Sequence, residues 1–300
     1  MKILITGGLG FIFSHVAEYF SKKHHVTVLD NISDGSHPNL IDEWDDIDVY
    51  KKDISDIEWI NGEYDIIIHA AAESNVDKSL NHQISFTNNN VLGTVHVLEW
   101  LKKKKLYGNK CPTLIYINTD EVYGSTEHWC EPHQATKPSN PYAASKAAAG
   151  SFCWAYHKTY GIPLQEVRLC NVIGRRQATT KLLPRIIDRI RNKQKMPVYD
   201  NGEFTREYMD VRDVAPILDQ VIQCEEQRIF NLTFNQEISI TKMIRYVENI
   251  MGRKIKIVKS TRVGHDAHYR MVPDELILNQ PINWHKITST IRWMLDELEL

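Results

Sequence analysis

Two adjacent carboxylic acids, Asp120 and Glu121, follow the apolar run TLIYI within the stretch TLIYINTDEVYG. Such a run is typical of a buried strand, and in an open α/β sheet ligands bind where the strands end. Adjacent carboxyl groups in a partly dry site have pKa values that separate, so that one holds a proton while its neighbour is ionised. The pair therefore fits a general acid and a general base, and an ordinary solvated turn is the alternative interpretation.

Tyr142 and Lys146 are four residues apart in NPYAASKAAAG, which places them on one face of a predicted helix. A tyrosine with its ordinary pKa of about 10 is a poor base at neutral pH. A nearby ammonium and a cationic nicotinamide would favour the phenolate, which can accept a proton from an alcohol. The alternative is an exposed tyrosine stacked on a lysine stem.

The stretch TGGLGFIF follows the first apolar run and opens a predicted helix, which is the context that a dinucleotide-binding turn requires. Gly7 and Gly10 would let the backbone approach a pyrophosphate, whose charge the helix N-terminus favours. Asp30 ends the second run, HVTVLD, and would accept hydrogen bonds from an adenosine ribose while repelling a 2'-phosphate. These residues predict NAD rather than NADP, although a helix-capping glycine turn beside an exposed acid would explain them without a cofactor. Phe13 stands where a third glycine usually permits close helix–strand packing.

Short apolar runs alternate with helical segments, which predicts an α/β fold with a Rossmann-type, doubly wound parallel sheet. Two long helices are expected at about 79–105 and 141–160. Beyond Asn171 shorter elements predict a smaller C-terminal α/β substrate lobe. We therefore expect a dinucleotide-binding domain over residues 1–168, with a segment at about 207–230 returning to it, and a mainly substrate-binding lobe over 169–300.

Composition favours a small-molecule enzyme. The 300 residues are 42% apolar, and a formal charge of -2 with both signs interspersed predicts binding neither to nucleic acid nor to a membrane surface. The start MKILITGG resembles a strand and no signal peptide, and the five cysteines include no C-x-x-C, so we expect a cytoplasmic protein with reduced thiols. The histidines lack metal-ligand spacing, and no metal site is predicted.

Together, the motifs TGGLGFI, HAAAESNVDKSL, NTDEVYG and YAASK resemble those of extended short-chain dehydrogenase/reductases, specifically the nucleotide-sugar 4,6-dehydratases, over almost the whole chain. The resemblance implies a redox-neutral cycle with bound NAD. Tyr142, with Lys146, would deprotonate the sugar C4 hydroxyl, which Thr119 positions, while hydride passes to NAD. Glu121 would then remove the C5 proton, and Asp120 would protonate the departing C6 hydroxyl before hydride returns to C6.

The resemblance also implies ligand contacts. It places the cofactor against Gly7, Gly10, Phe11, Ile12, Asp30, Asn31, Asp53, Ile54, Ala70, Ala71, Ala72, Tyr142 and Lys146. It places the nucleotide sugar against Glu73, Ser74, Asn171, Lys181, Leu182, Arg206 and Arg262. The arginines suit a diphosphate. Asn75 stands where the family commonly has a histidine. The family pairs its two long helices into a four-helix interface, so a homodimer is expected.

The identity of the sugar stays open at this point. The chain resembles UDP-sugar members, and UDP-N-acetylglucosamine is favoured, with or without inversion at C5, over UDP-glucose or dTDP-glucose. Cys170, beside Asn171, could assist that inversion, although a buried structural thiol is the commoner role of such a residue. A nucleotide-sugar 4-epimerase would need NAD, Tyr142 and Lys146 but neither carboxylate. A non-catalytic dinucleotide-binding sensor would need only the fold.

Overall fold

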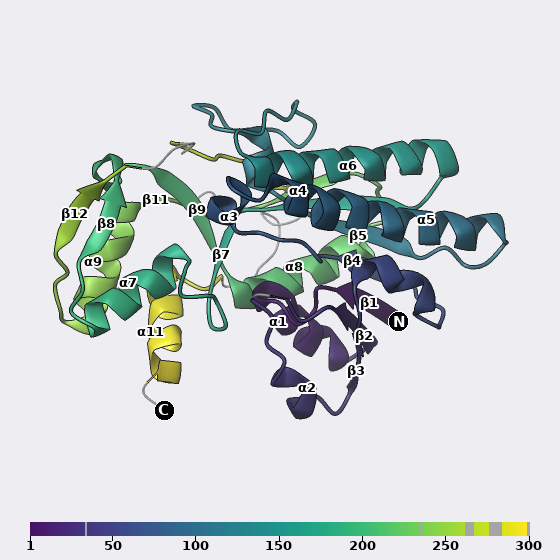
Figure 1. Ribbon diagram of the computed structural model, residues 1–300, viewed down its shortest axis with the longest axis horizontal. Coiled ribbons are helices and arrows are strands. Elements are labelled where there is room, and N and C mark those ends of the chain that lie inside the picture. Colours follow the sequence, from purple (N-terminus) through teal and green to yellow (C-terminus); the bar gives the residue numbers. More distant parts are fainter. Residues whose placement is uncertain (34, 235, 262–266, 276–283, 299–300) are drawn as a thin grey trace.

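Seven parallel strands form the main sheet, in the order β10-β6-β5-β4-β1-β2-β3 (Figure 1). The computed structural model describes residues 1–33, 35–234, 236–261, 267–275 and 284–298. The strands are β1 (Lys2–Thr6), β2 (His25–Asp30), β3 (Ile47–Lys51), β4 (Ile66–His69), β5 (Thr113–Thr119), β6 (Leu164–Leu169) and β10 (Ile229–Leu232). The predicted Rossmann-type sheet is confirmed. Its order reverses between β1 and β4, where such sheets open a ligand crevice.

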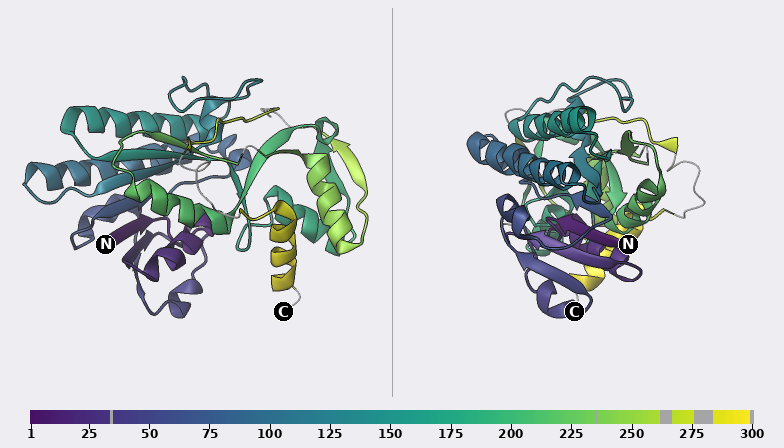
Figure 2. Two further views of the ribbon diagram at one scale, coloured as in Figure 1. Left: turned by 180° about the vertical axis from the view of Figure 1, so that it is seen from behind. Right: turned by 90° about the vertical axis from the view of Figure 1, so that its right-hand side faces the viewer.

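Helices cover both faces of this sheet because successive strand side chains point to opposite sides. Ile3 and Ile5 pack in the same core as Val16 of α1 (Phe11–Ser21), and α8 (Val211–Gln223) lies beside α1 on that face. Leu4 faces the other way, toward Leu98 of α5 (Gly93–Leu106) and Ala149 of α6 (Pro141–Tyr160). Figure 2 shows α5 and α6 side by side on their face of the sheet.

The helix expected at 141–160 is present with those bounds, but the one expected at 79–105 is divided. A short helix, α3 (Val76–Ser79), ends where the long helix was predicted to begin. His82 has non-helical backbone angles, φ -132° and ψ 46°, and helical structure resumes only after it. It then continues through α4 (Gln83–Phe86) and the π-helical turn η2 (Thr87–Leu92) into α5. The remaining short elements of this lobe are α2 (Leu40–Glu43), η1 (Ile54–Trp59) and η3 (Asp120–Tyr123).

A smaller lobe lies at the opposite end of the molecule from the N-terminus (Figure 1). It contains a three-stranded sheet of β7 (Asn171–Ile173), β9 (Thr205–Asp210) and β11 (Glu237–Ser239), and a pair formed by β8 (Met196–Tyr199) and β12 (Ile257–Ser260). Around them pack α7 (Leu182–Arg191), α9 (Ile240–Met251) and α11 (Ile287–Leu298), with the turn η4 (Asp200–Gly202). Ile187, Met243 and Ile291 belong to the separate core of this lobe.

The chain crosses between the lobes more than once. After β9 it returns through α8, which packs on α1, to β10, which pairs with β6 at the edge of the large sheet. We keep the division into a domain of residues 1–168 plus this returning segment, and a lobe of mainly 169–300, as a proposal. Over the described residues, we find no helix with the length and apolar character that a membrane crossing demands.

Candidate active site

The glycine turn after β1 lies against the loop that follows β4. Gly7 has φ +73°, and a Cβ atom at this position would lie 2.8 Å from both the backbone N and the Cα of Ala71. Gly10 is the N-cap of α1, and the first turn of that helix carries no acidic residue. This turn and the helix N-terminus offer backbone N–H groups to an anion without a side chain in the way. The residues present therefore fit a dinucleotide diphosphate.

Asp30 ends β2, lines one cavity together with Gly7 and Gly10, and is 6% exposed. Its Oδ2 accepts a hydrogen bond from the backbone N–H of Leu9 at 3.0 Å, and its Oδ1 accepts from Ile32 N–H at 2.8 Å and from Ser36 Oγ at 2.9 Å. These three donors fix the carboxylate in place. Asp53 lies nearby, where it caps η1 and accepts from the Asn31 amide at 3.0 Å.

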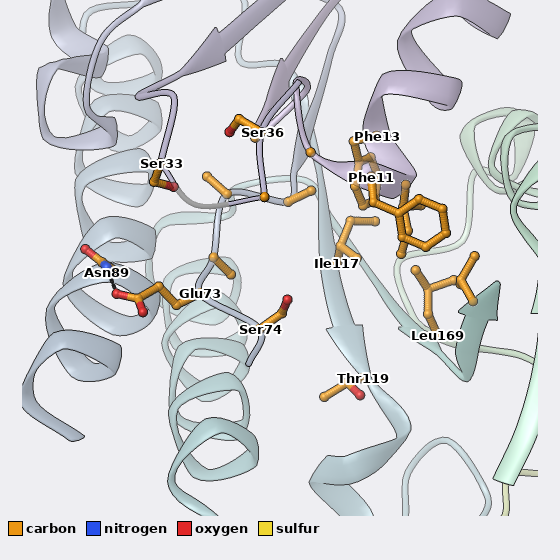
Figure 3. A pocket seen from close by; sticks show the side chains of 18 of the residues that line it. Phe11, Phe13, Ser33, Ser36, Glu73, Ser74, Asn89, Ile117, Thr119 and Leu169 are labelled. Atoms are coloured by element: carbon orange, nitrogen blue, oxygen red, sulfur yellow. Dashed lines mark hydrogen bonds between the residues drawn. The ribbon is translucent and has the colours of Figure 1, made fainter. Parts of the chain in front are cut away.

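One cavity brings together the side chains that the sequence analysis assigned to cofactor and catalysis. Figure 3 shows part of its wall, with Phe11, Glu73 and Thr119. It is lined by all the predicted cofactor residues, by the five predicted catalytic residues, and by Glu73 and Ser74. Phe13 also lines it, and its buried ring belongs to the core that α1 shares with the sheet. The Glu73 carboxylate is held by Lys78, at 2.9 Å, and by the Asn89 amide, so this residue organises the loop before α5.

The two adjacent acids form η3, the single turn that directly follows β5. The hydroxyl of Thr119, the N-cap of that turn, accepts a hydrogen bond from Glu121 N–H at 3.3 Å and donates one to Asp120 Oδ1 at 3.0 Å. Asp120 is 2% exposed, and its Oδ2 has no hydrogen-bond partner among the described residues. Burial, reinforced by the carboxylates of Glu121 and Glu207, raises the pKa of Asp120 to about 8. At neutral pH this acid holds its proton.

Glu121 is held by residues from two other parts of the chain. The Asn140 amide donates to its Oε2 at 2.9 Å, and the Tyr269 hydroxyl donates to the same oxygen at 3.4 Å. Asn140 also caps α6 by accepting a hydrogen bond from Ala143 N–H at 2.8 Å. Two donors from distant parts of the chain thus fix the carboxylate of Glu121.

Tyr142 and Lys146 lie in the first turns of α6, as their spacing predicts. Burial lowers the pKa of Lys146 to about 8, and its Nζ lies 4.4 Å from the centre of the Tyr116 ring. The pKa of the Tyr142 phenol is raised rather than lowered, because burial and the carboxylates of Glu121 and Asp120 disfavour the phenolate. The expectation that the lysine ammonium and a cationic nicotinamide together favour the phenolate stays a prediction, because the protein groups alone act in the opposite direction.

A second cavity adjoins the first and lies between the lobes, and Glu121, Asn171 and Lys181 line both. Leu182 and Arg206 line only the second, together with Asn75. Lys181 donates to the backbone carbonyl of Ser74 at 3.1 Å, and the Arg206 guanidinium lies 4.3 Å from the centre of the Tyr269 ring. Arg262 lies outside the described residues.

Sequence reasoning missed several residues of this site. Asn140 directly precedes the predicted helix, and its type is typical of an N-cap, but nothing local indicates its contact with Glu121. Tyr269 follows the segment GHDAH, and its hydroxyl reaches an acid 148 positions earlier. Glu207 is completely buried near Asp120, and burial raises its pKa to about 7. Cys170 lines the first cavity as a buried thiol, and burial raises its pKa as well.

Comparison with known proteins gives consistent relatives. The chain is 34% identical over 274 residues to the dTDP-D-glucose 4,6-dehydratase of Dictyostelium discoideum, a match that covers 83% of this chain but only 62% of that protein. It is 30% identical to the dTDP-glucose 4,6-dehydratase of Escherichia coli, with 100% of this chain and 95% of that protein covered.

A solved structure agrees with these relatives. DesIV, the dTDP-glucose 4,6-dehydratase of Streptomyces venezuelae, was crystallised with NAD bound, and it superimposes with a TM-score of 0.88 at 26% identity over 100% of this chain and 98% of that one. The family model described as the NAD dependent epimerase/dehydratase family matches residues 3–233. The chain therefore belongs to the NAD-dependent epimerase/dehydratase family, and NAD is its cofactor.

Proposed function

We propose that this protein is a nucleotide-sugar 4,6-dehydratase, which converts a nucleoside-diphosphate hexose to its 4-keto-6-deoxy derivative with loss of water. The observation that carries the proposal is the pairing of Asp120 and Glu121 in the cavity that also contains Tyr142 and Lys146. A 4-epimerase would use the tyrosine and the lysine but neither carboxylate. The raised pKa of Asp120, about 8, supports a general acid, which must hold a proton at neutral pH.

The glycine turn and Asp30 would hold NAD, which would supply a hydride acceptor for C4 and then a hydride donor for C6. The residues of the chain move the protons. Tyr142 takes the proton of the C4 hydroxyl, which Thr119 orients, so that C4 becomes a ketone and the C5 proton becomes acidic. Glu121 removes that proton. Asp120 donates its own to the C6 hydroxyl as the C6–O bond breaks, and water leaves.

The diphosphate of the substrate belongs in the second cavity. Arg206 and Lys181 line it and bring positive charge, Leu182 lines it as well, and Asn171 lines both cavities. This arrangement supports a sugar that enters the first cavity with its nucleotide held between the lobes. UDP-N-acetylglucosamine is our first candidate, with or without inversion at C5, because the chain resembles UDP-sugar members, and UDP-glucose and dTDP-glucose are the others.

The test is to offer these three nucleotide sugars separately and to examine each product by mass spectrometry and NMR. A dehydratase yields a product lighter by one water, with a methyl group at C6 and a ketone at C4. An unchanged mass with inverted C4 would instead identify an epimerase, and the absence of any conversion would favour a sensor. The configuration at C5 in the NMR spectrum decides whether that centre is inverted. Tyr142→Phe serves as the inactive control.

We also propose a homodimer formed through α5 and α6 with the short helical turns that precede α5. Large apolar side chains are exposed there, with Ile84 79%, Leu92 51% and Phe152 43% accessible. A monomer in light scattering at micromolar concentration would contradict this assembly. The five free cysteines suit a reducing compartment, and we propose a cytoplasmic location on that basis.

A further inference from the structure

A buried ion pair lies beneath the helix that carries Tyr142 and Lys146, and the proposed reaction does not use it. Glu166 and Arg168, on β6, are 1% and 5% exposed. Arg168 Nε donates to Glu166 Oε1 at 2.8 Å. Moving two charges out of water is unfavourable, and their attraction often does no more than offset that penalty. The pair therefore calls for an explanation other than stability alone.

The Glu166 carboxylate is fixed by two further donors. The Asn118 amide donates to Oε1 at 2.8 Å, and the Trp154 indole N–H donates to Oε2 at 2.7 Å. Asn118 comes from β5, directly before Thr119, whereas Trp154 comes from α6. Three donors, from two strands and one helix, thus hold the carboxylate in one position.

This carboxylate lies one helical turn from Lys146. Gly150 follows the lysine by four residues, and a Cβ atom at Gly150 would lie 3.1 Å from the Asn118 amide nitrogen and 3.5 Å from Glu166 Oε2. Tyr116 pairs with Glu166 across the strands, so both side chains point toward α6. Tyr116 also donates its hydroxyl proton to the Lys146 carbonyl at 3.0 Å, and the lysine Nζ lies over its ring. Glu166 and Lys146 therefore flank the same aromatic ring.

Most other titratable groups around Lys146 carry no charge near neutral pH. Burial and the lysine charge lower the pKa of His69, on β4, to about 3. Burial raises the pKa of the Cys153 thiol on α6 and of the Tyr116 and Tyr142 phenols. Asp120 and Glu121 face the Tyr142 side of the site, and Arg168 pairs with Glu166. Glu166 is thus the fixed anion on the side of Lys146 away from the reacting groups.

We propose that Glu166 is a positioning residue for the oxidation at C4: its buried carboxylate keeps Lys146 in the ammonium form beside Tyr142. The inference rests on the proposed function, because it assigns Glu166 a part in the same reaction. Glu166 touches neither substrate nor cofactor, and it acts only through the lysine. Asn118 and Trp154 hold the carboxylate in place, and the missing side chain of Gly150 lets it approach the helix.

The test measures the pH dependence of nicotinamide reduction after mixing with substrate. It is made in an Asp120→Asn background, which removes the other group whose pKa is about 8 and stalls the reaction after C4 oxidation. Lysine is charged only below its pKa, so the rate should fall as pH rises through about 8. Glu166→Gln removes the anion and should move this fall to lower pH by about one unit, with the substrate KM within about twofold.

Arg168→Met is the matched control, because it breaks the same ion pair but keeps the carboxylate. It should leave the fall in rate in place or move it to higher pH. Glu166→Gln leaves the buried guanidinium of Arg168 without its carboxylate and can lower stability. A second comparison separates this effect from the loss of the negative charge. The double variant Glu166→Gln with Arg168→Met is measured against Arg168→Met alone, and should show the same shift to lower pH.

A readout without turnover separates this inference from the proposed function. NMR of the 15N-labelled Lys146 side chain, assigned with Lys146→Arg, follows its titration in the substrate-free protein, where Glu166→Gln should again move it to lower pH. If no nucleotide sugar reduces NAD but the lysine titration moves, the proposed reaction fails and the electrostatic role stands. If Lys146 titrates at the same pH with and without the Glu166 carboxylate, both in the parental protein and in the Arg168→Met background, the proposed role of Glu166 is overturned.

Discussion

Replacing Asp120 with asparagine should divide the reaction between its two halves. The pKa of about 8 means that at pH 7 roughly nine in ten molecules hold the proton that the C6 hydroxyl needs. Asparagine keeps the approximate shape of the side chain but offers no acid, and the loss of one such proton transfer lowers a rate by about 10²–10⁴-fold. Oxidation at C4 relies on Tyr142 and Lys146, so it should continue.

The assay follows reduced nicotinamide by absorbance while 6-deoxy product is collected over time. In Asp120→Asn, reduced cofactor should accumulate and product should form slowly, and Glu121→Gln should behave alike because the C5 proton then stays in place. Tyr142→Phe should show neither signal, since no ketone forms. In the parental enzyme the elimination rate should fall about tenfold per pH unit above 8, as the acid loses its proton. Parental turnover in either amide variant, or reduced nicotinamide in Tyr142→Phe, would refute this assignment.

Three further outcomes are expected. Asn140→Asp should slow elimination by repelling Glu121, yet it keeps the α6 cap. Asn140→Ala should also lower the free energy of unfolding by about 1 kcal/mol. Equal unfolding free energies in the two variants would contradict the capping role. Gly7→Ala should weaken NAD binding and lower the free energy of unfolding more than Gly108→Ala does. Gly108 has a similar φ of +72°, but no atom lies within 4 Å of a new Cβ there, so its replacement should cost only the backbone strain, about 1–2 kcal/mol. Titration should show that the protein binds NAD more tightly than NADP, and that Asp30→Asn reduces the ratio of the two dissociation constants. An unchanged ratio would show that the Asp30 carboxylate does not select NAD.

Local patterns predicted the parts of the site that depend on neighbours in sequence. The strand, turn and helix around Gly7 and the shared face of Tyr142 and Lys146 follow from backbone geometry, which a short window of sequence specifies. The direction of the Tyr142 pKa shift could not be read in this way. It depends on how deeply the phenol is buried and on carboxylates that another loop brings beside it, and both are products of packing.

The ion pair beneath α6 shows the same limit. In the sequence, QEVRL contains three polar residues, Gln165, Glu166 and Arg168, and nothing in the segment indicates that the last two are buried. In the protein β6 lies between β5 and β10, where Asn118 is the neighbour of Arg168 across the strands and its amide donates to Glu166. Register between distant strands decides this, and no periodicity within one segment contains that information.

The contacts of Tyr269 connect the residue proposed to bind the diphosphate with the proposed base. Its ring stacks on Arg206, which belongs to the smaller lobe and lines the cavity proposed for the diphosphate, and its hydroxyl contacts Glu121 at the end of the large sheet. Under the proposed roles, a phosphate bound by Arg206 would lie beside the ring whose hydroxyl contacts Glu121. Positive charge alone would bind a diphosphate anywhere between the lobes, whereas this stacking makes the position of the nucleotide bear on the position of the Glu121 carboxylate. A single side chain from a distant segment thus contacts Arg206, which lines the second cavity, and Glu121, which lines both.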